Sequence, residues 1–263
     1  MSSVQLTRLR SQINALLAHF EKSEDFCRSL SSLFLLYGDK RSSINAWMRE
    51  DSSLNFFNVP GSVLAELDTR LSILSRENPK TAIVNADLLW NSNDYEIKKT
   101  AINIISNLDE LHQSYVIKRI HEWINPDLDK ILMRDILEAF ENKPNILVNE
   151  DWVKSLGFWL TSSEDEIVRL GLKALTQTIT MKYKNLPQIF NALMPVIRDP
   201  KIAIQKDLVD TLKALIVQSQ AETASFLIMC GNLYQNEIVM AFIRKNLPLF
   251  DSFFQKEIKT AIK

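Results

Sequence analysis

The sequence predicts an all-α protein, and three observations lead to this prediction. The 263 residues include only 5 glycines and 8 prolines, below the average shares of about 7% and 5%. So few glycines leave few positions for the tight reversals that join β-strands. Apolar residues recur at the helical period through nearly the whole chain, and strict alternation never persists. We therefore expect amphipathic helices of about 12–18 residues.

The expected helices are separated by clear turn signals. Apolar stripes predict helices over 5–20, 94–107 and 163–179. Ser163 followed three residues later by Glu166 predicts a capping box at the start of the third of these. Breaks are expected where proline or glycine follows a polar residue, at Gly38-Asp39, Asn78-Pro79, Asn125-Pro126, Lys143-Pro144, Asn185-Leu186-Pro187 and Asp199-Pro200.

Four of the expected helices begin alike, with a polar or acidic cap followed by an isoleucine. These isoleucines are Ile97, Ile131, Ile167 and Ile202, and they are 34, 36 and 35 residues apart. A period in the mid-thirties gives two short helices per unit and is typical of arrays of HEAT-like repeats. One such unit cannot bury its apolar stripe alone, so neighbouring units form a continuous core.

The repeat predicts an α-α superhelix, or solenoid, with a concave groove. The repeat is weaker at both ends of the chain, as expected of capping units. We expect one domain over 1–263, with N-terminal capping helices in 1–60, core repeats in 61–219 and C-terminal capping helices in 220–263.

A basic residue recurs at a matching point of four successive helices. Lys99, Arg134, Arg169 and Lys206 are 35, 35 and 37 residues apart, so stacking would place them in a row. Two interpretations stay open. The row pairs with acids of the adjacent repeat as a ladder of ion pairs, or it follows a phosphate backbone.

The overall charge shows no basic surplus. The net charge is -1 and the pI is near 6.3, whereas DNA-binding proteins usually carry excess positive charge. A basic groove on one face and an acidic surface on the opposite face would still give a net charge near zero. The chain shows no secretory signal and no stretch of about 18 apolar residues. It predicts a cytoplasmic protein without a membrane partner.

Motifs for common catalytic chemistry are missing from the sequence. There is no phosphate-binding glycine loop, no HExxH and no GxSxG. Cys27 and Cys230 follow no metal-ligand spacing and are expected to be reduced thiols. His19, His112 and His121 lie at unrelated helix positions. The sequence therefore predicts no metal site and no small-molecule cofactor.

Three tryptophans end helices at a similar point of the repeat. Trp90, Trp123 and Trp159 are interpreted as structural plugs between layers, with base-stacking platforms as the alternative.

Several segments resemble a known family. Phe57-Asn58-Val59-Pro60 looks like an aromatic-Gly-Val-x-x-Pro motif, and Leu88-Leu89-Trp90-Asn91 and Phe158-Trp159-Leu160-Thr161-Ser162 look like its repeat motifs. The order of elements is similar to the HEAT-like DNA alkylation-repair glycosylases of the AlkC/AlkD type, over roughly residues 55–250.

The resemblance implies that duplex DNA lies in the concave groove. Arg169 matches an arginine that faces DNA in the family, Lys206 is similarly placed in the next repeat, and Lys213 stands where the family has an arginine. With the row described above, the DNA-binding set is Lys99, Arg134, Arg169, Lys206 and Lys213. Asp127 matches the acid that stabilises the sugar cation while an alkylpurine leaves.

Two aromatic positions of the family are replaced in this chain. Pro126 and Asp210 stand where the family has groove tryptophans. Asp127 is then either the catalytic acid or the N-cap of the following helix. The leading hypothesis is a DNA-binding relative of the alkylpurine glycosylases, with base excision left open. The alternative is a non-enzymatic HEAT scaffold that binds a protein partner in its groove.

Overall fold

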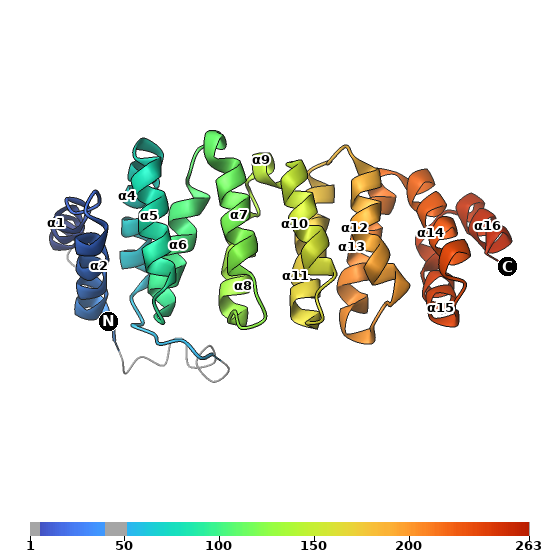
Figure 1. Cartoon of the computed structure of the whole chain (residues 1–263), viewed down its shortest axis with the longest axis horizontal. Coiled ribbons are helices and arrows are strands. Elements are labelled where there is room, and N and C mark those ends of the chain that lie inside the picture. Colours follow the sequence, from blue (N-terminus) through green and yellow to red (C-terminus); the bar gives the residue numbers. More distant parts are fainter. Residues whose placement is uncertain (1–5, 40–51, 263) are drawn as a thin grey trace. The chain divides into compact units, whose positions relative to one another are not determined.

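A computed structural model describes residues 6–39 and 52–262 of the chain. These residues form helices joined by turns and short segments, without a β-strand, and one isolated bridge joins Asn55 to Asp94. The all-α prediction is confirmed (Figure 1). None of the helices within the described ranges is long and apolar enough to cross a bilayer.

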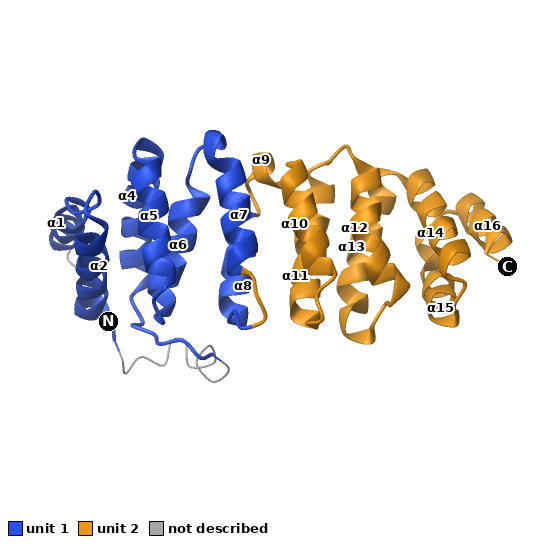
Figure 2. Ribbon diagram, viewed as in Figure 1, with its two compact units in different colours: residues 1–123, 127–140 blue, residues 124–126, 141–263 orange. Residues whose placement is uncertain are grey.

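The chain divides into two compact units (Figure 2). Unit 1 comprises residues 1–123 and 127–140, and unit 2 comprises residues 124–126 and 141–263. The superhelix, its concave groove and the single repeat domain stay predictions.

Unit 1 is built from alternating helices in two layers. Helices α4, α6 and α8 pack in succession to form layer A, while α2 and α5 pack together behind them. Apolar residues on facing sides fill the space between the layers, so each helix buries one stripe. The helices are α1 (Leu6–Leu17), α2 (Ser23–Tyr37), α4 (Gly61–Glu77), α5 (Pro79–Trp90), α6 (Tyr95–Ser106), η1 (Glu110–His112), α7 (Gln113–Trp123) and α8 (Lys130–Phe140).

Unit 2 repeats the same alternation. Helices α11 and α13 pack together as its layer A, and α10, α12, α14 and α16 pack in succession as the other layer. Helix α15 packs against α14. The helices are α9 (Pro144–Leu147), α10 (Glu150–Leu160), α11 (Asp165–Thr180), α12 (Leu186–Arg198), η2 (Ile202–Ile204), α13 (Gln205–Gln218), α14 (Gln220–Tyr234), α15 (Glu237–Asn246), η3 (Leu247–Leu249) and α16 (Ser252–Ala261).

The predicted repeat period holds for three helix starts and shifts at the fourth. Helices α6, α8 and α11 begin 35 residues apart, and their marker isoleucines are buried. Ile202, the fourth marker, is 89% exposed, whereas Ile204 is buried. The 3₁₀ turn η2 delays the start of α13 by one short turn. Ile204 is therefore the structural equivalent, and the choice of Ile202 was wrong.

The predicted capping box at Ser163 does not form. Helix α11 begins at Asp165 with Glu164 as its N-cap, and no side chain caps it. Glu166 consequently occupies the second helical position and not the third, from which a side chain reaches back to the cap. It lies instead 3.5 Å from Arg169.

The segment 52–60, called the strap, ties the starts of two layer A helices in unit 1. Asn55 exchanges two backbone hydrogen bonds with the start of α6, to Asn93 and from Tyr95. The buried Glu96 carboxylate accepts three backbone N–H groups of the strap, those of Phe57, Asn58 and Val59, at 3.0, 2.7 and 3.4 Å. A carboxylate removed from water needs such partners, so Glu96 fixes the strap.

Two residues, one within the strap and one at the end of α2, allow the backbone of the strap to pass close to the end of α2. Asn58 has φ 56°, a left-handed conformation that asparagine tolerates and that glycine adopts most readily. It occupies the glycine position of the motif Phe57-Asn58-Val59-Pro60. Gly38 follows α2, and a Cβ there would lie 2.4 Å from the Phe57 carbonyl oxygen. Only glycine fits that approach.

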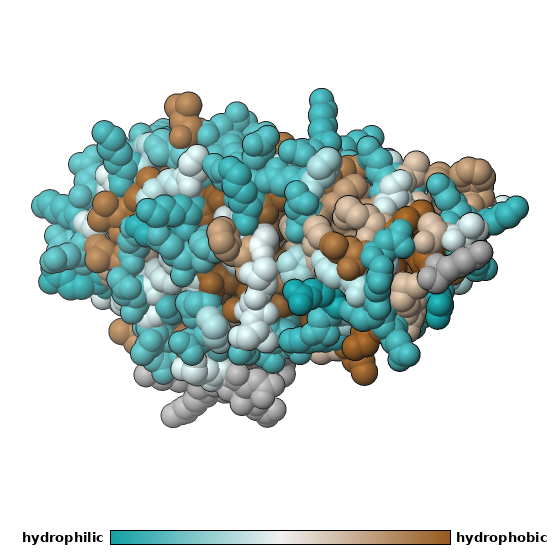
Figure 3. Space-filling view, turned by 45° about the vertical axis from the view of Figure 1, so that its right-hand side comes forward, coloured by the Kyte–Doolittle hydropathy of each residue, from teal (hydrophilic) through white to brown (hydrophobic). Residues whose placement is uncertain are grey.

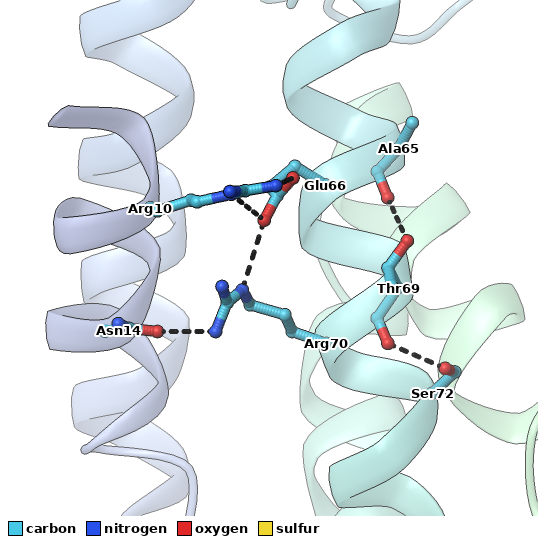
Figure 4. A network of polar contacts seen from close by, with 7 residues as sticks. All are labelled: Arg10, Asn14, Ala65, Glu66, Thr69, Arg70 and Ser72. Atoms are coloured by element: carbon cyan, nitrogen blue, oxygen red, sulfur yellow. Dashed lines mark hydrogen bonds and ion pairs between the residues drawn. The ribbon is translucent and has the colours of Figure 1, made fainter. Parts of the chain in front are cut away.

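A polar network joins α1 to α4 in unit 1 (Figure 4). Glu66 accepts Arg10 Nε at 3.0 Å and Arg70 Nε at 3.3 Å, and Arg70 also donates to Asn14 at 2.9 Å. The hydrogen bond from Arg10 lowers the pKa of Glu66. The network orients the N-terminal helix pair at the edge of the unit.

The buried Glu96 carboxylate predicts a large effect of a small substitution. Glu96→Gln keeps the side-chain shape, but it replaces one accepting oxygen by an NH₂ group, which then faces a backbone N–H donor of the strap without an acceptor between them. We expect the free energy of unfolding in urea to fall by about 2–4 kcal/mol. Glu21→Gln changes an exposed carboxylate and should stay within about 0.5 kcal/mol of the parent. Equal losses in both variants would contradict the anchoring role.

Candidate functional site

In unit 1 the predicted basic row is engaged in ion pairs. Lys99 on α6 places its Nζ 3.4 Å from the buried Asp135 carboxylate on α8 and 3.2 Å from the Tyr95 hydroxyl. Burial raises the pKa of Asp135, and the charge of Lys99 acts against that rise. Arg134 is exposed, with its Nε 3.6 Å from Glu138 on the same helix.

Unit 2 repeats the arrangement with an arginine. Arg169 Nε on α11 lies 2.9 Å from Oδ2 of the buried Asp207 on α13. The hydrogen bond to Asp207 raises the pKa of Arg169. In both units a base of one layer A helix therefore pairs with a buried acid of the next. For Lys99 and Arg169, the ladder interpretation of the basic row is the one observed.

The remaining predicted lysines meet in a hollow of unit 2 between α13 and α15. This lysine hollow has a volume of about 380 Å³. Lys213 Nζ lies 2.9 Å from Asp210, and Lys206 makes no hydrogen bond or ion pair with a described residue. The residues that line it are Gln205, Lys206, Val209, Asp210, Lys213, Lys245 and Asn246.

Lys245 is a member of this cluster that the sequence interpretation missed. Its Nζ donates to Gln205 Oε1 at 3.2 Å, which joins α15 to the start of α13. Lys245 and Lys213 are each the ninth residue of their helix. The acidic start Glu237-Ile238 resembles the starts used to find the repeat, and extending the register to α15 would have revealed Lys245.

A second hollow adjoins the first and has a different character. This apolar hollow has a volume of about 340 Å³ and shares Gln205 and Lys245 with the lysine hollow. Ile238 is 60% exposed there, and Phe242 is buried beneath the surface. Its other members are Glu237 and Ala241. The surface view shows further apolar side chains among hydrophilic ones over the C-terminal half of the chain (Figure 3).

Asp127 lies in the turn before α8 and is exposed. It is not the N-cap of that helix, because Asp129 takes this role: Asp129 Oδ1 accepts the backbone N–H of Ile131 at 3.0 Å. Asp129 Oδ2 also accepts the Ser52 hydroxyl at 2.6 Å and thereby holds the strap. The helix begins at Lys130, so a cap at Asp127 would stand two residues too early.

The four tryptophans that lie within residues 6–39 and 52–262 are packed against one another in pairs. Trp90 and Trp123 stack with ring centroids 4.0 Å apart, and Lys98 Nζ lies 4.5 Å from the centre of the Trp90 ring. Trp159 is buried edge-to-face against Trp152. These contacts are structural, and they leave the rings of Trp123 and Trp159 closed to a stacked base.

The cysteines are free thiols, and burial raises the pKa of Cys230 to about 12. Within residues 6–39 and 52–262, no group of three or more histidine, cysteine or acidic side chains is placed to hold a metal ion. Comparison with protein-family models and with curated protein sequences finds no match to this chain.

The ladder pairs predict strong coupling between Arg169 and Asp207. A double-mutant cycle with Arg169→Ala and Asp207→Ala should give a coupling energy of about 1–3 kcal/mol in urea unfolding, because Asp207 is buried and needs its partner. The exposed pair Lys154 and Asp151 on α10 provides the matched control and should show no resolvable coupling. Additive effects at Arg169 and Asp207 would contradict a structural role for Arg169.

Proposed function

We propose that this protein binds DNA through its phosphate backbone and does not excise bases. In this proposal it is a HEAT-like helical-repeat protein, a degenerate relative of the alkylation-repair glycosylases, located in the cytoplasm. The lysine hollow of unit 2 is the principal contact. The convergence of Lys206, Lys213 and Lys245 on one hollow is the observation that carries the proposal.

Three ammonium groups around one concavity favour an anion. Asp210 lines the same hollow and offsets part of this charge by its ion pair with Lys213, yet neither Lys206 nor Lys245 forms an ion pair with a carboxylate of residues 6–39 and 52–262. A phosphate group that enters would release bound counterions, which is the main source of affinity in backbone recognition. The pattern suits a polyanion better than a small neutral ligand.

The surroundings of Asp127 support binding without base excision. Stabilising a sugar cation needs a carboxylate in a site shielded from water, with aromatic walls that hold the departing base. Asp127 is exposed, Pro126 replaces one wall, and Trp123 stacks on Trp90. An acid in water gives weak electrostatic stabilisation.

A protein partner is the second candidate ligand. The observation that favours it is the exposure of Ile202 and Val217, at 89% and 88%, near the two ends of α13. Exposed apolar side chains such as these, one in the turn η2 and one in the last turn of α13, suit a protein surface better than a phosphate backbone.

The DNA proposal predicts a salt-dependent affinity that depends on the lysine hollow. In fluorescence anisotropy, duplex DNA should bind and weaken steeply between about 50 and 200 mM salt. Lys206→Ala with Lys213→Ala should reduce the slope of log affinity against log salt by about 2. Lys154→Ala with Lys259→Ala removes two lysines from α10 and α16 and should leave the slope unchanged. An unchanged slope in Lys206→Ala with Lys213→Ala would overturn the role of the lysine hollow, and no duplex binding by the wild type at about 50 mM salt would favour the protein partner.

The absence of base excision is tested on methylated duplex DNA. We expect no release of 7-methylguanine or 3-methyladenine above the protein-free control, in the wild type or in Asp127→Asn. Binding of the same DNA by both proteins shows that they are folded and engaged. Release by the wild type that disappears in Asp127→Asn would overturn this part of the proposal and make Asp127 the catalytic acid.

A further inference from the structure

We infer that unit 2 seats an unpaired nucleotide across its two adjoining hollows, with the phosphate in the lysine hollow and the base in the apolar hollow. This inference rests on the proposed DNA binding and names the kind of DNA that fits: DNA with unpaired bases. The two hollows share Gln205 and Lys245, so one ligand can occupy both.

The shared wall sets the position of the phosphate. Gln205 Oε1 holds the Lys245 ammonium at 3.2 Å, and Gln205 Nε2 donates to the Pro200 carbonyl at 3.1 Å. Both contacts fix Lys245 at the boundary of the hollows. A phosphate beside Lys245 would also face Lys206, so two positive charges meet it within one concavity.

The apolar hollow suits a base better than a second phosphate. Ile238 and Ala241 offer exposed aliphatic surface over the buried Phe242 ring, and covering such surface with the face of a base removes it from water. Glu237 stands at the same hollow. Its carboxylate repels a phosphate but accepts hydrogen bonds from a base amino group, such as that of cytosine.

An intact duplex does not fill both hollows. Its bases are stacked and paired inside the helix, so a phosphate in the lysine hollow would leave the apolar hollow in water. Unpaired bases expose their faces and edges and can turn toward the protein. A lysine hollow next to an apolar hollow thus favours single strands, strand ends or bulges over a continuous duplex.

The test compares three fluorescent oligomers of about ten units, a length within the usual single-strand site size. These are oligo-dC, oligo-dT and a tetrahydrofuran abasic oligomer, measured by anisotropy at about 50 mM salt, where phosphate contacts are strong. The abasic oligomer carries the same phosphates without bases. We expect oligo-dC to bind at least about five-fold more tightly than the abasic oligomer, since one seated base contributes about 1 kcal/mol or more.

Two substitutions assign this difference to the apolar hollow. Ile238→Ser should reduce the ratio of oligo-dC to abasic affinity below about two-fold, because it removes exposed aliphatic surface, while abasic binding stays unchanged. Glu237→Gln should reduce the preference for oligo-dC over oligo-dT. Ile202→Ser changes an even more exposed isoleucine, which lines neither hollow, and should leave all ratios as in the wild type.

The outcomes separate the inference from the proposed function. Equal affinity of the wild type for the oligo-dC and abasic oligomers would overturn the nucleotide site, while leaving backbone binding supported. Abasic binding that does not change in Lys206→Ala with Lys213→Ala would overturn the role of the lysine hollow itself. Tighter binding of duplex than of oligo-dC would also contradict the preference for unpaired bases.

Discussion

A carboxylate buried between two helices needs a base beside it, and this requirement determines where positive charge is available in this protein. Asp135 and Asp207 are both buried in layer A, and each pairs with a base of the preceding helix. Leaving such a carboxylate unpaired costs several kcal/mol. Lys99 and Arg169 are therefore committed to the fold, although their spacing alone suits a phosphate backbone equally well.

The same requirement explains why Lys206 of α13 remains available. Asp135 lies 36 residues after Lys99, and Asp207 lies 38 residues after Arg169. The corresponding stretch after Lys206 is Phe242-Ile243-Arg244, which contains no acid. Helix α15 thus ends the ladder of unit 2. Beyond the last of these pairs, a hollow lies between α13 and α15, and Lys206 lines it without an ion pair to a described residue.

The helices can be predicted from the sequence because their apolar stripes are long and proline or glycine marks the breaks between them. The 35-residue period of the helix starts from α6 to α11 is predicted for the same reason. The sequence places helix starts less well. Asp127 and Asp129 are equally good caps by composition, but Asp129 accepts the Ile131 N–H and also the Ser52 hydroxyl, which reaches it from 77 residues away. The hollow itself depends on contacts between α13 and α15 that no local pattern encodes. Lys245 was missed because the repeat was not extended to the last helices.

The aromatic residues complete the distinction between binding and chemistry. A base that leaves as a neutral purine must be held while the sugar gains positive charge, which needs open aromatic faces beside a shielded acid. In the described part of unit 1 the tryptophans Trp90 and Trp123 stack on each other, and Asp127 is exposed. In the apolar hollow of unit 2 the exposed apolar surface is aliphatic, at Ile238 and Ala241, and three lysines line the adjoining lysine hollow. Aliphatic surface beside lysines suits the proposed binding of a nucleotide, but this hollow offers no open aromatic face to hold a departing base, because Phe242 is buried.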